Sequence, residues 1–346
     1  MTHIELVNLA ALAIGLLFGA CGQVTGFCLQ RGLKEYWSGS DGYKLHAFAM
    51  ALAVALAGTQ ALAAAGLVDL GKSLYMMPTW SWLLMPLGGL MFGYGMGMAN
   101  GCGARALVLL GQGNLRSLIV LLCLGIAAHM VLTGVFGPMR AALAEQTSVS
   151  PAALTFTAGW PRTLATLSAI AILLTFALRP RAQGRRLNDL AAGVVMGLLV
   201  AAGWWVTGWL GNDDFEPVAV ASLTFVAPIG DTIQYAMIAT GMSLRFGIAV
   251  VAGVVAGAFV TAALRRQCRL EGFESPRQML RYMTGGVLMG AGGALAFGCS
   301  IGQGLTGLST LSYSSMVSAA AILAGARLAW RHGHPRNAAL NVPGAA

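Results

Sequence analysis

Nine apolar segments, each close to the length of a membrane span, recur along this chain of 346 residues. A transmembrane helix needs about 20 predominantly apolar residues. Only 10% of the residues are charged, against about 25% in soluble domains, which is too few to cover a water-facing surface. The sequence therefore predicts an all-α polytopic membrane protein and excludes a soluble enzyme and a nucleic-acid-binding domain. The predicted spans are Ile4 to Cys21, Leu45 to Leu67, Trp82 to Ala99, Leu118 to Phe136, Leu164 to Leu178, Leu190 to Leu210, Leu244 to Leu264, Tyr282 to Gly298 and Tyr313 to Trp330.

Four further segments are too apolar for loops, yet too short or too interrupted by Gly and Pro for full spans. Non-helical backbone survives at membrane depth only where protein or a water-filled cavity satisfies its N–H and C=O groups. We therefore expect short re-entrant helices that mark a pathway. These segments are Gly22 to Gly32, Cys102 to Gly113, Val218 to Gly241 and Cys299 to Leu311.

The basic residues give this arrangement a direction. All but four of the 21 Lys and Arg residues fall on one side of the nine predicted spans. Cytoplasmic loops carry the excess of Lys and Arg, so that side is predicted to be cytoplasmic, with the N-terminus periplasmic and the C-terminus cytoplasmic. The four exceptions are Lys72, Arg140, Arg162 and Arg245.

An internal repeat relates the two halves of the chain. Gly88 to Cys102 (GGLMFGYGMGMANGC) and Gly285 to Cys299 (GGVLMGAGGALAFGC) are identical at 7 of 15 positions. Glycine-rich composition explains several matches, but not Cys opposite Cys. Because the third and eighth spans run in opposite directions, the repeats are inverted, which is a transporter and channel architecture. We expect one membrane domain over 1–346, with repeats at 1–136 and 189–346 and a connector at 137–188 that holds the fifth span.

A shorter match at a different spacing supports the repeat. Gly15 to Gly19 (GLLFG) aligns with Gly193 to Gly197 (GVVMG), so glycines stand opposite each other in the first and sixth spans.

Two cysteines occupy equivalent positions in the repeat. Cys102 and Cys299 each stand where a glycine-rich span ends and a short polar segment begins. A helix that starts at each cysteine would turn its free N–H groups and positive dipole end toward the centre, where they attract an anion. The thiols would add weak S–H donors. The alternative is that they are small packing residues, which is the usual role of a lone membrane cysteine.

Three cysteine motifs stand along the chain: TGFCLQRG around Cys28, GGLMFGYGMGMANGCGAR around Cys102 and GGVLMGAGGALAFGCSIGQGL around Cys299. Together they resemble the motifs of the YeeE/YedE family of bacterial inner-membrane sulfur transporters, and the similarity covers nearly the whole chain. The resemblance implies an hourglass-like protein with pseudo-two-fold symmetry. It also implies uptake of thiosulfate along Cys28, Cys102 and Cys299, and a cytosolic TusA-like sulfur-carrier partner docking on Arg265 to Arg281. No cofactor is expected.

Five other residues have a possible pathway role and a plainer alternative. Arg105 would attract an anion to the cytoplasmic mouth or simply anchor a loop. Ser222 and Thr224 lie in the cysteine-free re-entrant segment, where they would line the pathway or only pack. Asp231 would gate the pathway or bind an ion, or it would cap the short helix that follows. Gln303 follows Cys299 within its motif.

The remaining candidates are interpreted as structural. His129 is expected to be a hydrogen-bonded interior histidine. Cys21, Cys123 and Cys268 have no partner in the repeat, and we expect all six cysteines to be free thiols.

Two alternative functions stay open. Met96 and Met98 ahead of Cys102 are soft ligands of the kind that select Cu(I), although their repeat partners are Gly293 and Leu295. A membrane sulfurtransferase would form a persulfide on an activated thiolate. No His, Lys or second Cys stands at a useful spacing from Cys102 or Cys299 in the sequence, which favours a transporter over an enzyme.

Overall fold

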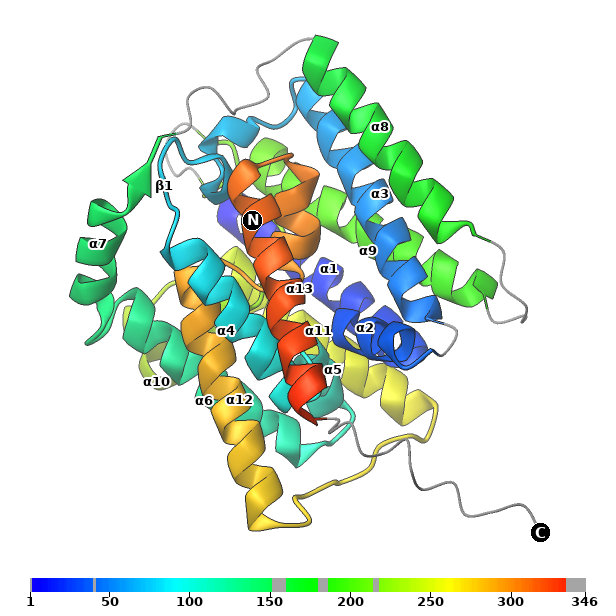
Figure 1. Ribbon diagram of the computed structural model, residues 1–346, viewed down its shortest axis with the longest axis vertical. Coiled ribbons are helices and arrows are strands. Elements are labelled where there is room, and N and C mark those ends of the chain that lie inside the picture. Colours follow the sequence, from blue (N-terminus) through cyan, green and yellow to red (C-terminus); the bar gives the residue numbers. More distant parts are fainter. Residues whose placement is uncertain (1, 40–41, 151–159, 180–185, 214–217, 334–346) are drawn as a thin grey trace.

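The computed structural model describes residues 2–39, 42–150, 160–179, 186–213 and 218–333, and helices dominate them (Figure 1). Nine long helices overlap the nine predicted spans, and five of these are long and apolar enough on those grounds alone to cross a membrane. The polytopic all-α prediction is confirmed. The nine are α1 (His3–Thr25), α3 (Tyr43–Ala64), α4 (Leu84–Met98), α6 (Leu115–Leu132), α8 (Trp160–Ala177), α9 (Arg186–Trp205), α11 (Phe246–Leu264), α12 (Pro276–Leu295) and α13 (Tyr313–Gly333).

Short helices occupy or adjoin the four predicted re-entrant segments. They are α2 (Leu29–Trp37), α5 (Gly103–Gly111), α10 (Val226–Ile238) and the π-helix η5 (Gly302–Gly307). The remaining elements lie at the ends of the spans. They are η1 (Leu70–Lys72), η2 (Leu74–Met76), β1 (Trp80–Ser81), α7 (Gly137–Gln146), β2 (Ser148–Val149), η3 (Val206–Leu210) and η4 (Ala239–Gly241), with β1 and β2 paired antiparallel.

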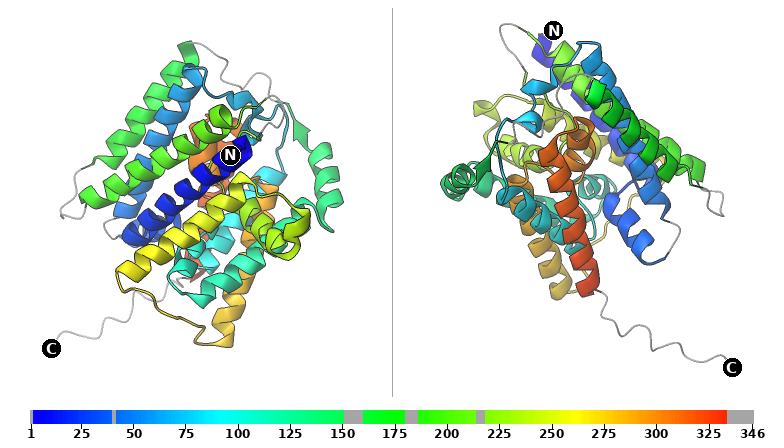
Figure 2. Two further views of the ribbon diagram at one scale, coloured as in Figure 1. Left: turned by 180° about the vertical axis from the view of Figure 1, so that it is seen from behind. Right: turned by 45° about the horizontal axis from the view of Figure 1, so that its top comes forward.

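Long and short helices follow the same order in both halves. The first half runs α1, α2, α3, α4, α5, α6 and the second α9, α10, α11, α12, η5, α13. Helices also pack in exchanged pairs: α1 lies along α11 while α9 lies along α3, and α4 lies along α13 while α12 lies along α6 (Figures 1 and 2). Two halves related by a two-fold axis would pack in this way. The inverted repeat stays a prediction, and these contacts support it.

Glycines at equivalent positions make the close contact between α4 and α12. A Cβ added at Gly88 would lie 2.6 Å from the carbonyl oxygen of Gly292, and one added at Gly95 would lie 2.6 Å from that of Gly285. The repeat alignment pairs Gly88 with Gly285 and Gly95 with Gly292, so each contact is the symmetry copy of the other. Only residues without a side chain allow two helix backbones to approach so closely.

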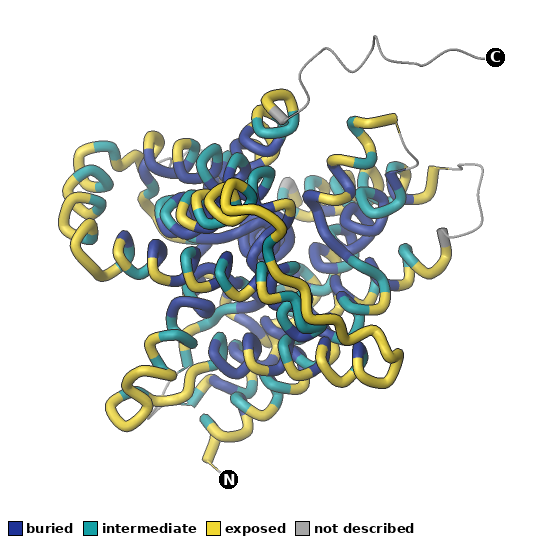
Figure 3. The backbone as a smooth tube through the Cα atoms, turned by 90° about the horizontal axis from the view of Figure 1, so that it is seen from below, coloured by how far each residue is buried: buried dark blue, intermediate teal, exposed yellow. Residues whose placement is uncertain are grey.

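Burial separates a protein core from an apolar outer surface. Buried residues lie along the inner faces of the helices, and exposed ones along the periphery (Figure 3). α8 packs against α3, and its exposed residues include Leu164, Leu167 and Ile172, with exposed fractions of 58% to 67%. Large apolar side chains left outside a packed core are what a lipid-facing helix presents.

Candidate functional site

The three motif cysteines each stand where a short helical segment begins. Cys28 immediately precedes α2 and Cys102 immediately precedes α5, and both have extended backbone, as an N-cap residue does. Cys299 precedes η5, and its carbonyl accepts the N–H of Gln303 at 2.7 Å. The prediction that a helix starts at Cys102 is confirmed. At Cys299 it is nearly so, because η5 begins three residues later.

These three thiols meet in the protein core. Their residues are 4%, 3% and 1% exposed for Cys28, Cys102 and Cys299. The Cys28 and Cys102 side chains interact with each other, and Cys102 is within electrostatic range of Cys299. Ser300 also lies beside Cys102, without the geometry of a hydrogen bond. Segments about 200 residues apart in the sequence therefore bring their sulfur atoms into one cluster.

The backbone amide three residues further on faces each sulfur. Gly302 N–H donates to Sγ of Cys299 at 3.2 Å. The amides of Arg31 and Arg105 face Cys28 and Cys102 in the same way, without closing a capping hydrogen bond. A thiol sulfur that accepts from the amide still has its S–H free to donate. The cluster therefore presents weak donors at the positive ends of short helices.

A cavity of about 530 Å³ opens near the N-terminus of α1, and we call it the N-terminal vestibule. Ser222 and Thr224 both line it. The Ser222 hydroxyl donates to the carbonyl of Val200 at 2.6 Å, which fixes the segment to α9. Thr224 interacts with Cys299, so the vestibule reaches the cysteine cluster.

Tyr75 is a member of this site that sequence reasoning missed. It lies in η2, outside the predicted spans, yet it is only 6% exposed. Its phenol interacts with Thr224 and with Cys299. Ser312 donates to its backbone carbonyl at 2.6 Å and anchors the turn. A two-turn 3-10 segment between apolar helices carries no periodic signal, so only the fold reveals it.

Asp231 does not cap a helix, and that interpretation is wrong. α10 begins at Val226, five residues before Asp231, with Phe225 at the N-cap position. The carboxylate instead lies 3.2 Å from Nε2 of His129 on α6 and lines the N-terminal vestibule. His129 therefore faces a carboxylate at the vestibule, although its Nε2 lacks the geometry of a hydrogen bond.

Arg105 and Gln303 flank the cluster. Arg105 donates to the carbonyl of Gly22 at 3.3 Å, which ties α5 to α1, and its guanidinium lies near Cys28 and Cys102. It also lines a cavity of about 240 Å³ on the side away from the N-terminal vestibule. Gln303 is 1% exposed, and its amide donates to the carbonyl of Ala296 at 2.5 Å. That bond braces the turn that carries Cys299.

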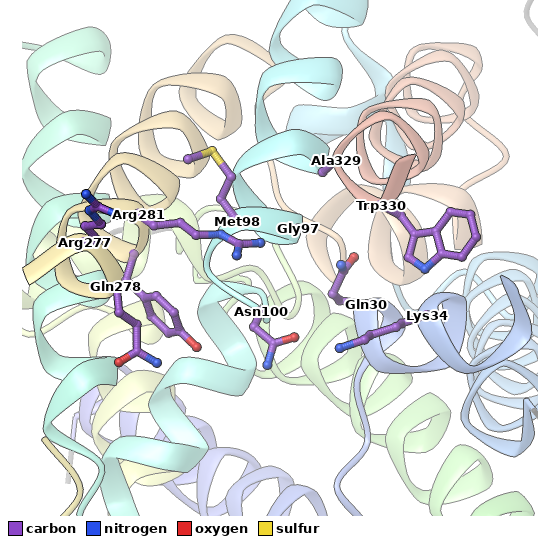
Figure 4. Close-up of a pocket in the computed structure, with 11 residues that line it drawn as sticks. Gln30, Lys34, Gly97, Met98, Asn100, Arg277, Gln278, Arg281, Ala329 and Trp330 are labelled. Carbon is purple, nitrogen blue, oxygen red and sulfur yellow. The ribbon is translucent and has the colours of Figure 1, made fainter. Parts of the chain in front are cut away.

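A second large cavity, of about 480 Å³, lies between α2, α4, α12 and α13 (Figure 4). Its lining includes Lys34, Arg277 and Arg281 but no Asp or Glu, and we call it the basic vestibule. Gln30 and Asn100 also line it. These residues stand two positions from Cys28 and Cys102, so the basic vestibule adjoins the cysteine cluster. Cavities therefore lie on two sides of the thiols.

All six cysteines are free, as predicted. Cys21 and Cys123 are half-buried within α1 and α6, and Cys268 is exposed between α11 and α12. Contrary to what spacing along the sequence indicates, Cys102 does have a second cysteine within reach, since Cys28 comes from a different segment of the chain. Spacing along the sequence does not reveal a contact made by tertiary structure.

Comparison with known proteins identifies the family of this chain. A family model described as sulphur transport matches residues 24–328, which include all three motif cysteines. The chain belongs to the sulphur-transport family. This sulphur-transport protein is 26% identical over 346 residues, and 92% of each chain, to the thiosulfate transporter TsuA of Escherichia coli (strain K12). It is 26% identical over 339 residues to the thiosulfate transporter TsuA of Spirochaeta thermophila, covering 92% of this chain and 97% of that one. Both relatives are transporters by name, so the reading as a transporter and not an enzyme is supported.

Proposed function

We propose that this protein takes up thiosulfate, or a closely related sulfur anion, across the bacterial inner membrane. The observation that carries the proposal is the cluster of Cys28, Cys102 and Cys299 between the N-terminal vestibule and the basic vestibule. The names of both full-length relatives favour thiosulfate as the cargo. The anion moves from the N-terminal vestibule past Cys299, Cys102 and Cys28 to the Arg105 side.

The thiols serve as neutral hydrogen-bond donors. Thiosulfate is a dianion, and two unit charges about 4 Å apart repel by about 4 kcal/mol at an effective dielectric constant of about 20. A thiolate would therefore expel the cargo, whereas an S–H group donates to it. The short helices add their N-terminal dipoles without adding a fixed charge. Because S–H groups are weak donors, the anion binds each thiol weakly and can leave it for the next.

The direction follows from the distribution of basic residues. Arg105, Lys34 and Arg281 lie on the side predicted to be cytoplasmic, and the N-terminal vestibule lies at the predicted periplasmic end. The C-terminal residues 334–346 lie outside the described part of the chain. A TusA-like carrier would collect the transported anion at the basic loop 265–281.

Transport of Cu(I) is less compatible with the structure. Met96 on α4 is fully buried in the protein core, and Met98 lines the basic vestibule beside three cationic residues. Positive charge in a vestibule repels a metal cation and attracts an anion.

Uptake into proteoliposomes tests the proposal with four cargoes side by side: radiolabelled thiosulfate, sulfite, selenite and Cu(I). We expect saturable thiosulfate uptake that exceeds the uptake of the other three. Preferential uptake of Cu(I), or no uptake of any sulfur anion above protein-free vesicles, would refute the proposed cargo.

A further inference from the structure

We infer that the basic vestibule is an oxyanion-binding site in its own right, separate from the cysteine cluster. Its ligand class is a small tetrahedral dianion, such as sulfate or the sulfonate end of thiosulfate. The inference does not depend on which cargo the cysteines pass.

Charge gives the first argument. Lys34 on α2 and Arg277 and Arg281 on α12 line the cavity, and within the described residues none of the three has an ion-pair partner. Arg277 and Arg281 stand four residues apart, where like charges on one helix face repel. An anion between the helices removes that repulsion and gains charge-assisted hydrogen bonds.

Convergence of the side chains gives the second argument. Lys34 and Arg281 extend toward Asn100 from opposite sides of the cavity (Figure 4). Asn100 has a left-handed backbone, with φ of 57°, at the turn between α4 and α5. That turn places a neutral amide between two cations, where its NH₂ group can donate to an anion.

Gln30 gives the third and independent argument. It lines the cavity, is 5% exposed, and its Oε1 has no hydrogen-bond partner within the described residues. Leaving a buried amide unpaired costs about 1–3 kcal/mol. Because no described residue holds that oxygen, the amide can turn so that its NH₂ group donates to an oxyanion in the cavity that Gln30 lines. A surface that is basic only to orient the protein in the membrane needs no such buried amide.

The volume suits this ligand. A cavity of about 480 Å³ holds a small dianion together with several waters. The phosphate of a phospholipid headgroup is also a tetrahedral oxyanion, so the test must distinguish binding of a free anion from binding of a lipid. Gln30 and Asn100, two residues from the pathway cysteines, favour the free anion.

Calorimetric titration of sulfate into the full-length protein tests the inference, in nanodiscs of phosphatidylcholine. We expect saturable binding that weakens by at least about tenfold in Lys34→Gln/Arg281→Gln. The matched control Arg265→Gln/Arg269→Gln also removes two cations, but neither lines the vestibule, and we expect a change within about twofold. Gln30→Leu should weaken binding by about three- to tenfold without changing any charge.

Four outcomes would overturn the inference. They are no saturable binding to the wild-type protein, equal weakening in the two double variants, unchanged binding in Gln30→Leu, and loss of sulfate binding when the nanodiscs contain phosphatidylglycerol. The last would assign the pocket to a lipid headgroup. Cys299→Ala keeps the two proposals apart, because it should abolish uptake and leave sulfate binding intact. Sulfate binding in a protein that transports no thiosulfate would refute the proposed cargo only.

Discussion

The carboxylate of Asp231 on α10 lies 3.2 Å from Nε2 of His129 on α6, at the edge of the N-terminal vestibule. A Cβ at the neighbouring Gly230 would lie 2.8 Å from the same nitrogen, so the glycine makes room for the pair. An unpaired carboxylate here would repel an incoming anion. When protonated, the histidine balances that negative charge in the vestibule.

That pairing gives a double-variant prediction. His129→Ala should lower thiosulfate uptake severalfold, because it leaves Asp231 unbalanced. Asp231→Asn should transport close to normally, and His129→Ala/Asp231→Asn should recover most of the loss. Initial uptake rates at one pH for the four proteins measure the coupling. Equal uptake by the single His129 variant and the double variant would contradict this role.

Substitution of the cysteines tests the pathway itself. Changing Cys28, Cys102 or Cys299 singly to Ala should reduce uptake by at least about tenfold, because each change removes a donor and little volume. The same change at the other three cysteines should be tolerated. Melting temperatures of all six variants should stay near that of the wild type. Similar uptake in all six would remove the distinction between pathway and structural thiols.

Tyr75→Phe tests the residue found only in the structure. The ring should keep its packing against Trp204; the two rings meet edge to face, with their centroids 6.2 Å apart. Loss of the hydroxyl beside Cys299 and Thr224 should raise the half-saturating thiosulfate concentration severalfold. Tyr36→Phe, at an exposed tyrosine, is the control. An unchanged concentration dependence would show that the phenol does not meet the anion.

Intact mass spectrometry tests whether the thiols stay unmodified. After transport of thiosulfate we expect no added sulfur on Cys28, Cys102 or Cys299. The contact between Cys28 and Cys102 makes this test sharper, since a persulfide on one would meet the thiol of the other. A persistent gain of one sulfur atom would support a sulfurtransferase.

Gly88→Val tests the helix crossing. Its side chain would collide with the backbone of α12, and overpacking of this kind costs about 1–3 kcal/mol or more. We expect a lower melting temperature and a lower yield of folded protein. Gly272→Val is the control, because no atom lies within 4 Å of a Cβ there. Equal melting temperatures would mean that the crossing tolerates side chains.

Much of this fold is readable from the sequence because lipid imposes simple rules. Apolar length predicts the spans, and glycine-rich interruptions predict α2, α5, α10 and η5. The repeat alignment also predicts which glycines are equivalent, and Gly88 and Gly285 do occupy matching contacts between α4 and α12.

The missed features all depend on tertiary structure. The contact between Cys28 and Cys102 joins segments that no spacing rule connects. Tyr75 enters the core from a short turn without periodicity. Sequence reasoning places the start of the short helix after Asp231, whereas α10 begins at Val226 and holds Pro228 in its first turn.

The glycine crossing between α4 and α12 also bears on how the protein moves. Many transporters rock one half against the other to expose their site to each side in turn. Here the backbones of the two helices lie in contact. A shift along the crossing would drive side chains such as Leu295 into the space beside Gly88, where only the hydrogen of a glycine fits. Rocking would have to break this close contact between the halves. Turnover would then be governed by rotation of thiols and nearby side chains, which takes picoseconds to nanoseconds when unhindered, while domain motions take microseconds to milliseconds.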